Sequence, residues 1–380
     1  MSLTAKNLTH LNPQSAAPDW EEAIAYFKSR KAVLFLTYCR FWEPHAFVQQ
    51  SLAKLLVRNG VRVDWVDGEG WRKMTPTIYE PSPLLHVHKR FALPGRRWSV
   101  IRALDQKLFQ LTFKARLKKL GGNPLVWIQG GFREELVEAM PYVDVFSTFD
   151  DPFYFAADSA SLAKSKLILA QNSFTGNQLK AYPQARVALP PVDMTLPLDS
   201  GKEYVFPARF PKKIMGYIGS FFDEDYDLEL FEYMVRTLPD WGFLLAGRSN
   251  AAGLAKAEAL KRYPNFHYVP WAPREEILSL WKKLSVTLLL HRPRREQYGA
   301  FPTKTLESTY FGVPCVGTKT PKNQDIQKYF QTSSFPSELR KLAVEASFID
   351  KEKVKAIYQE LSRRTDPKEQ LIDVARALGR

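Results

Sequence analysis

Short apolar runs alternate along the chain with longer segments whose apolar positions recur every three to four residues. The short runs have the length and the β-branched or aromatic content of buried strands, and the longer segments have the period of amphipathic helices. This alternation is typical of βαβ units, in which helices cover a parallel sheet. The strands expected in the first half lie at residues 31–38, 61–67, 84–88, 124–129, 142–148, 166–171 and 186–190. Helices are expected at residues 45–60, ending at Gly60, and at residues 132–140.

The same pattern restarts after a proline-rich, weakly patterned stretch at residues 190–212, which has the composition of a linker. Further strands are expected at residues 213–219, 242–247, 266–270, 285–291 and 314–318, with helices at 226–238, 251–262, 273–283 and 303–311. We therefore predict an α/β protein in which two Rossmann-like domains face a cleft. The predicted boundaries are residues 1–195, a linker at 196–212, and residues 213–380 with the C-terminal helices.

Composition narrows the class of protein. The 380 residues carry 54 Lys and Arg against 40 Asp and Glu, a net charge of +14, and their number fits two domains. The two cysteines exclude a disulfide framework and a cysteine-built zinc site. Neither an 18-residue apolar span nor a signal peptide is evident, so we expect a cytoplasmic protein, soluble or peripheral on the inner face of the membrane. The charge predicts an acidic partner: nucleic acid, an anionic membrane or a phosphorylated ligand.

Residues 299–318 carry the most chemistry. A proline suited to a first helical turn and a glycine suited to a helix end bracket Thr303, Lys304 and Glu307, which occupy neighbouring positions on the expected helix. Free N–H groups and a lysine at a helix start attract phosphate oxygens. A carboxylate one turn further, about 6 Å along the axis, can accept both hydroxyls of a ribose. The spacing fits a nucleoside diphosphate, and it also fits a plain amphipathic helix with surface charges.

The same segment resembles a known family. Residues 301–318 are similar to the donor-binding helix of the GT-B glycosyltransferases, particularly the large retaining family four, where a Pro-x-Lys-x-x-Glu run precedes a Gly-x-Pro-x-Val strand. The similarity continues at residues 216–247 and 265–291, and more weakly at 144–194. It implies transfer of a sugar from a UDP- or GDP-linked donor to an envelope glycan or lipid-linked acceptor, with retention of configuration. It implies no cofactor and no metal.

The resemblance also implies roles for single residues. Glu307 would bind the donor ribose, and Thr303 and Lys304 the pyrophosphate. The backbone around Trp271 and Ala272 would receive the base, and Gly219 and Ser220 would let the sheet end approach the phosphates.

Two departures from the family pattern concern the phosphates. The second glutamate that many members have eight residues before the ribose-binding one is Gly299 in this chain. The usual Arg–Lys phosphate pair is replaced by the acidic stretch 220–227. Arg248 and Arg292 are the candidate replacements, with Arg294 and Arg295 close behind.

Acceptor-side candidates follow two strand ends in the first half. Arg40 and His45 follow the strand at 31–38, and Asp150 and Asp151 follow the strand at 142–148. We take these four as catalytic candidates that contact sugar or phosphate. The alternatives are packing and capping in the first loop and a turn in the second, because Asp before proline favours turns. A strict acid–base pair is not needed, since the leaving diphosphate can take the acceptor proton.

The positive charge is densest at residues 86–120, with ten Lys and Arg against one acid. Helical spacing predicts one apolar strip through Leu104 and Leu111 and a second through Phe109 and Phe113. A basic amphipathic helix with exposed apolar residues is typical of a membrane interface. The alternative is that both strips are core and the cations a solvated rim. The predicted membrane or acceptor contacts are Arg102, Lys107, Lys114, Arg116, Lys118 and Lys119.

Two other classes of function remain open. A nucleic-acid base glucosyltransferase would share the architecture and explain the charge, although no nucleic-acid recognition motif is present and nucleic acid is not the expected partner. A non-catalytic GT-B subunit that docks a partner at the membrane would explain the missing first glutamate.

Overall fold

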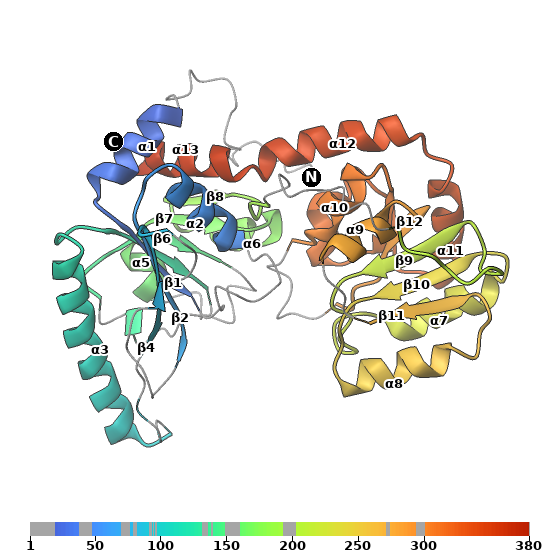
Figure 1. The fold of residues 1–380 in the computed structure, drawn as a ribbon, viewed down its shortest axis with the longest axis horizontal. Helices are drawn as coiled ribbons and strands as arrows, with labels where there is room; N and C mark the ends of the chain where they lie inside the picture. Colours follow the sequence, from blue (N-terminus) through green and yellow to red (C-terminus); the bar gives the residue numbers. More distant parts are fainter. Residues whose placement is uncertain are drawn as a thin grey trace, which may run out of the picture. The chain divides into compact units, whose positions relative to one another are not determined.

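The computed structural model divides the chain into two compact units (Figure 1). Unit 1 comprises Met1–Val192 and Arg364–Arg380, and unit 2 comprises Asp193–Arg363. The residues that the structure describes are 20–37, 48–69, 77–78, 82–90, 93, 95, 97–130, 136–137, 140–148, 160–192, 203–270, 274–293 and 301–379.

The sheet of unit 1 has the strand order β3-β4-β2-β1-β5-β6-β7-β8. All neighbouring strands are parallel except β3, which runs antiparallel to β4. The order reverses between β1 and β5, and ligands in open α/β sheets bind beyond the carboxyl ends of the strands at such a switch point. The strands are β1 (Val33–Thr37), β2 (Val63–Glu69), β3 (Thr77–Ile78), β4 (Leu85–Arg90), β5 (Leu125–Gln129), β6 (Val143–Ser147), β7 (Ser165–Ala170) and β8 (Ala185–Val187).

Helices cover both faces of this sheet because its strands are apolar on both sides. Val33 and Phe35 of β1 join one buried cluster with α1, α2 and α13, whereas Leu34 and Leu36 join another with α3. The helices are α1 (Trp20–Ser29), α2 (Val48–Arg58), α3 (Ser99–Lys119), α5 (Ala160–Lys164), α6 (Ser173–Gln178) and α13 (Pro367–Leu378).

The last helix, α13, corrects the predicted boundary of the C-terminal domain. Leu371 and Val374 of α13 are fully buried in the core of unit 1, and the backbone N–H of Val192 donates to the carbonyl of Thr365 at 2.9 Å. Figure 1 shows α13 (red) beside α1 (blue), although they lie at opposite ends of the sequence. Each buried aliphatic side chain contributes about 1.5–3 kcal/mol. Residues 213–380 therefore do not form one domain, since the final helix completes the core of unit 1.

Unit 2 contains a six-stranded parallel sheet in the order β11-β10-β9-β12-β13-β14. This is the strand order of a Rossmann dinucleotide-binding sheet, with its switch point between β9 and β12. The strands are β9 (Ile214–Ile218), β10 (Gly242–Ala246), β11 (Phe266–Val269), β12 (Val286–Leu289), β13 (Cys315–Thr318) and β14 (Thr332–Ser333). The helices are α7 (Leu228–Thr237), α8 (Ala251–Leu260), α9 (Arg274–Trp281), α10 (Lys304–Tyr310), η3 (Pro321–Ile326), α11 (Pro336–Ala346) and α12 (Lys351–Arg364).

The predicted α/β class with two parallel-sheet units is confirmed. The helix expected to end at Gly60 is α2, which ends at Arg58, and Gly60 follows two residues later with a φ of 78°. The expected helix at 132–140 lies mostly outside the described residues. Within the predicted linker, Tyr204 and Phe206 pack on unit 2, where the Tyr204 hydroxyl lies 2.7 Å from Nε2 of His267. The described second part of the linker is therefore part of unit 2.

Candidate functional site

The topology of unit 2 places the predicted donor residues along one edge. Because β9, β10 and β12 are parallel neighbours, their carboxyl ends lie at the same edge of the sheet. The helix α10 then connects β12 to β13 at this switch point. Seven of the nine predicted residues are described there: Gly219, Ser220, Arg248, Arg292, Thr303, Lys304 and Glu307. Trp271 and Ala272 lie outside the described residues.

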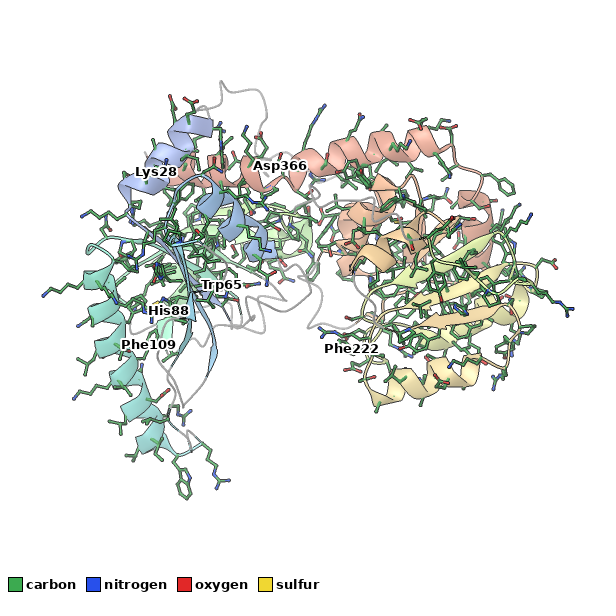
Figure 2. The ribbon with its side chains drawn as sticks, viewed as in Figure 1. Lys28, Trp65, His88, Phe109, Phe222 and Asp366 are labelled. Atoms are coloured by element: carbon green, nitrogen blue, oxygen red, sulfur yellow. The ribbon has the colours of Figure 1, made fainter. Side chains whose placement is uncertain are left out.

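Two glycines allow the ends of β9 and β10 to touch. A Cβ atom at position 247 would lie 2.2 Å from the carbonyl oxygen of Gly219, and Gly247 has a φ of 133°. The backbone N–H of Gly219 donates to Ala246 at 2.8 Å, and that of Phe221 donates to Arg248 at 3.0 Å. Phe222, labelled in Figure 2, marks the loop that follows. Only glycine fits at position 247, and the backbone at the end of β9 is held against that of β10.

A buried carboxylate paired with a lysine lies on α10. Glu307 is 6% exposed, and its Oε2 accepts from Nζ of Lys304 at 2.9 Å. Ser308 fixes this helix to the sheet, because its Oγ lies 2.8 Å from Oγ1 of Thr287 on β12 and donates to the carbonyl of Val313. A carboxylate has acceptor capacity beyond one lysine. The pair can therefore bind a hydroxyl-bearing, negatively charged ligand, with Glu307 accepting from hydroxyls and Lys304 contacting an anionic group.

Tyr217 of β9 lies beneath this edge and was not identified from the sequence. Its hydroxyl donates to the carbonyl of Ser220 at 3.3 Å. Burial raises the pKa of Tyr217 well above its usual value, and the negative charges of Asp225 and Glu307 raise it further, so the hydroxyl stays protonated. Tyr217 thus supports the backbone after β9. The sequence places it inside a strand, where an aromatic residue is expected to be core.

Arg292 is engaged by carboxylates. Its guanidinium pairs with Glu229 and lies 3.8 Å from Asp227, and Lys256 pairs with Glu229 and, at 2.6 Å, with Asp223. This network joins the loop after β9, two helices and the end of β12, so much of the charge of Arg292 is neutralised within the protein. Arg248, in contrast, is exposed and has no ion pair among the described residues.

The acceptor-side candidates of unit 1 lie outside the residues that the structure describes. Arg40, His45, Asp150 and Asp151 follow the carboxyl ends of β1 and β6, as expected, but none of the four is described. In the described ranges, no three His, Cys, Asp or Glu side chains converge in the way that a metal site requires.

On α3, the two predicted apolar strips have different environments. Phe109 and Phe113 are buried against the sheet, whereas Leu104 and Leu111 are 58% and 60% exposed. The alternative that both strips are core is therefore wrong, because the strip through Leu104 and Leu111 is exposed.

Five of the six cations predicted to contact a membrane or acceptor are exposed: Arg102, Lys107, Lys114, Lys118 and Lys119. Arg116 differs, because its Nη1 is buried without a hydrogen-bond partner among the described residues. Burial lowers the pKa of Arg116, and the nearby Asp64 carboxylate partly opposes this. Asp64 in turn binds His88 at 2.9 Å. His88 and Phe109 are labelled in Figure 2. Arg116 thus belongs to the interior side of α3.

The sequence matches no protein-family model and no curated protein. The structure matches solved structures along most of its length. Sucrose-phosphate synthase from Thermosynechococcus elongatus aligns with a TM-score of 0.62 at 16% identity, over 91% of this chain and 97% of that one. The α,α-trehalose-phosphate synthase from Burkholderia xenovorans, in complex with glucose-6-phosphate, aligns at 0.64 and 11%, over 92% and 100%. HepE from Anabaena, in complex with UDP and glucose, aligns at 0.58 and 12%, over 91% and 99%.

At these identities the similarity establishes the fold. The chain has the GT-B fold of the nucleotide-sugar glycosyltransferases, as the resemblance of residues 301–318 predicted. Each alignment includes at least 90% of both chains, so the fold extends through both units.

Proposed function

We propose that the chain is a glycosyltransferase that moves a sugar from a UDP- or GDP-linked donor to a glycan or lipid-linked acceptor, with retention of anomeric configuration. The observation that carries the proposal is the buried Glu307, paired with Lys304 at the switch point of a Rossmann sheet. Fold alone does not give function, so the residues at this edge matter more than the architecture.

The edge supplies what a nucleotide-sugar donor needs. Glu307 accepts hydrogen bonds from the ribose hydroxyls, and Lys304 and Arg248 lie along the diphosphate. Similar structures include HepE in complex with UDP and a trehalose-6-phosphate synthase bound to UDP-2-fluoro glucose. In the reaction, the bond between the anomeric carbon and the diphosphate oxygen breaks, and its electron pair stays on that oxygen. The acceptor oxygen bonds to the anomeric carbon and its proton passes to the diphosphate, whose charge the cations stabilise.

A thermal-shift panel of nucleoside diphosphates tests this proposal. UDP or GDP should raise the melting temperature of the wild-type protein, because a ligand at 100 times its Kd stabilises by about 2.7 kcal/mol. Glu307→Ala should abolish the shift. Glu352→Ala is the matched control, since Glu352 and Lys355 form a pair of the same spacing on the surface of unit 2, and it should retain the shift. If no nucleotide stabilises the wild type, the transferase proposal fails and the non-catalytic subunit is favoured.

We also propose that unit 1 contacts an anionic membrane through the outer side of α3, which would suit a lipid-linked acceptor. None of the described helices has both the length and the apolar character that a membrane span requires. Six positions of α3, spaced alternately by four and three residues, share its outer side: Val100, Leu104, Lys107, Leu111, Lys114 and Lys118. The one acid of the helix, Asp105, is buried and accepts from the backbone N–H of Leu93 at 2.9 Å. The outer side therefore has cations and apolar groups and no carboxylate.

Vesicle flotation tests this contact. The full-length protein should float with phosphatidylcholine vesicles that contain phosphatidylglycerol. Replacement of Lys107, Lys114, Lys118 and Lys119 by Gln should weaken binding by about two orders of magnitude or more, because each cation near an anionic surface contributes about 1 kcal/mol. The control replaces four exposed lysines of unit 2, Lys341, Lys351, Lys353 and Lys355. Equal flotation of both variants contradicts the contact, and tighter binding to duplex DNA than to vesicles favours the base-modifying alternative.

A further inference from the structure

The switch point of unit 1 contains a buried pair of polar side chains that has no part in the donor site or in the membrane contact. Gln129 ends β5 and is 1% exposed, and Thr37 ends β1. The hydroxyl of Thr37 donates to Oε1 of Gln129 at 2.7 Å. β1 and β5 are the two strands between which the strand order reverses, so the pair lies at the place where this type of sheet binds ligands.

Only one end of the Gln129 side-chain amide, the oxygen, has a hydrogen-bond partner among the described residues. Its Nε2 is buried and has no hydrogen-bond partner among the residues that the structure describes. Burying an amide N–H without a partner is unfavourable, and buried polar groups are nearly always paired. Two neighbouring polar groups at this edge are paired within unit 1. The indole Nε1 of Trp127 donates to Ser147 at 2.8 Å, and the backbone N–H of Gln171 donates to Thr148 at 3.1 Å.

The described side chains at the ends of four strands favour a hydroxyl-bearing ligand. Within the described residues, the positions at or directly after the carboxyl ends of β1, β5, β6 and β7 are uncharged: Thr37, Gln129, Ser147 and Gln171. A phosphate or carboxylate is normally bound by cations, and these four positions supply none. A hydroxyl both donates and accepts hydrogen bonds. It therefore satisfies the unpaired end of the amide whichever way the amide is turned.

We infer that Gln129 binds a hydroxyl group of a sugar at the carboxyl end of the unit 1 sheet, and that Thr37 is the positioning residue that holds the amide in place. The inference rests on the proposed function, because a sugar is a reactant in it. It adds a binding residue on unit 1, whereas the donor residues Lys304 and Glu307 belong to unit 2.

Saturation-transfer NMR on the full-length protein tests the inference with four free sugars: glucose, galactose, mannose and N-acetylglucosamine, each added in the presence of UDP. At least one sugar should bind the wild type. Gln129→Met, which keeps the length of the side chain but has no amide, should weaken that sugar by about tenfold or more. Gln129→Glu should restore binding to within about threefold of the wild type, because a carboxylate still accepts from the sugar hydroxyl and from Thr37.

Folding and nucleotide binding are followed in the same samples. The UDP-induced rise in melting temperature should be equal in all variants, since unit 2 is unchanged. If Gln129→Met does not fold, Thr37→Val provides the second test and should weaken the sugar about threefold. The inference is overturned if Gln129→Met binds the sugar as tightly as the wild type. It is also overturned if no sugar binds while UDP still stabilises the protein, and in that case the proposed function stands. If no sugar binds and neither UDP nor GDP stabilises the protein, both the inference and the proposed function are overturned.

Discussion

The switch points of the two sheets have the same topology and different chemistry. In unit 1 the ends of β1 and β5 hold Thr37 and Gln129, both neutral and buried. In unit 2 the corresponding edge holds Lys304 and Glu307, with Arg292 in a network of carboxylates nearby. The backbone architecture thus provides two equivalent places for ligands, and the side chains differ between them. We propose a sugar hydroxyl as the ligand of the neutral pair and a nucleoside diphosphate as the ligand of the charged pair.

The largest effect is expected when the strand ends of unit 2 are forced apart. In Gly247→Ala the new methyl group would meet the carbonyl oxygen of Gly219, so the backbone must move. We expect a loss of about 3 kcal/mol in the free energy of unfolding, together with loss of UDP or GDP binding. Urea unfolding and calorimetry measure the two effects.

Gly122→Ala is the matched control for that substitution. Gly122 in unit 1 also has a positive φ, 86°, but a Cβ atom there meets nothing within 4 Å. Its cost should be only about 1 kcal/mol, from the backbone conformation alone. Equal losses for the two variants would mean that the contact between the ends of β9 and β10 is unimportant.

A smaller effect is expected at the charged edge of unit 2. Glu229 pairs with both Arg292 and Lys256. If these cations contact the donor diphosphate, Glu229 would compete with it. Glu229→Gln should therefore tighten nucleotide binding by about threefold at low ionic strength, and the gain should fade at high salt, where exposed charges are screened. Titration calorimetry at two salt concentrations measures it. Glu232 lies on the same helix as Glu229 and pairs with Arg262. Glu232→Gln should leave nucleotide affinity unchanged. Weaker binding in Glu229→Gln would instead make Glu229 part of the structure that supports the ligand.

The strands, and the residues that follow them at the carboxyl end of the unit 2 sheet, could be predicted from the sequence because they depend on local pattern. The apolar runs before Gly219 and Arg292 form buried parallel strands, and parallel strands bring the residues after them to one edge. The bracketing proline and glycine, together with the spacing of Lys304 and Glu307, identified α10 in the same way.

Features that depend on tertiary neighbours could not be predicted. The amphipathic pattern of α13 indicates a helix with an apolar side but does not say which sheet it covers. The count of cations on α3 placed Arg116 on the surface, although Phe113, three residues earlier, is buried on the same side. The sequence shows Gln129 only as a polar residue at the end of a strand. That its Nε2 lacks a partner among the described residues becomes evident only when the neighbouring side chains are known.

The central claim is that Glu307 binds the ribose of a nucleoside diphosphate. Titration calorimetry with UDP and 2′-deoxy-UDP, or with the guanosine pair if GDP is the ligand, tests it on the wild type and on Glu307→Gln. A hydrogen bond to a charged group is worth about 1.5–3 kcal/mol, so the deoxy ligand should bind the wild type roughly 10- to 100-fold more weakly. In Glu307→Gln this penalty should fall to a few-fold. The same penalty in both proteins would contradict the assignment of Glu307 to the ribose.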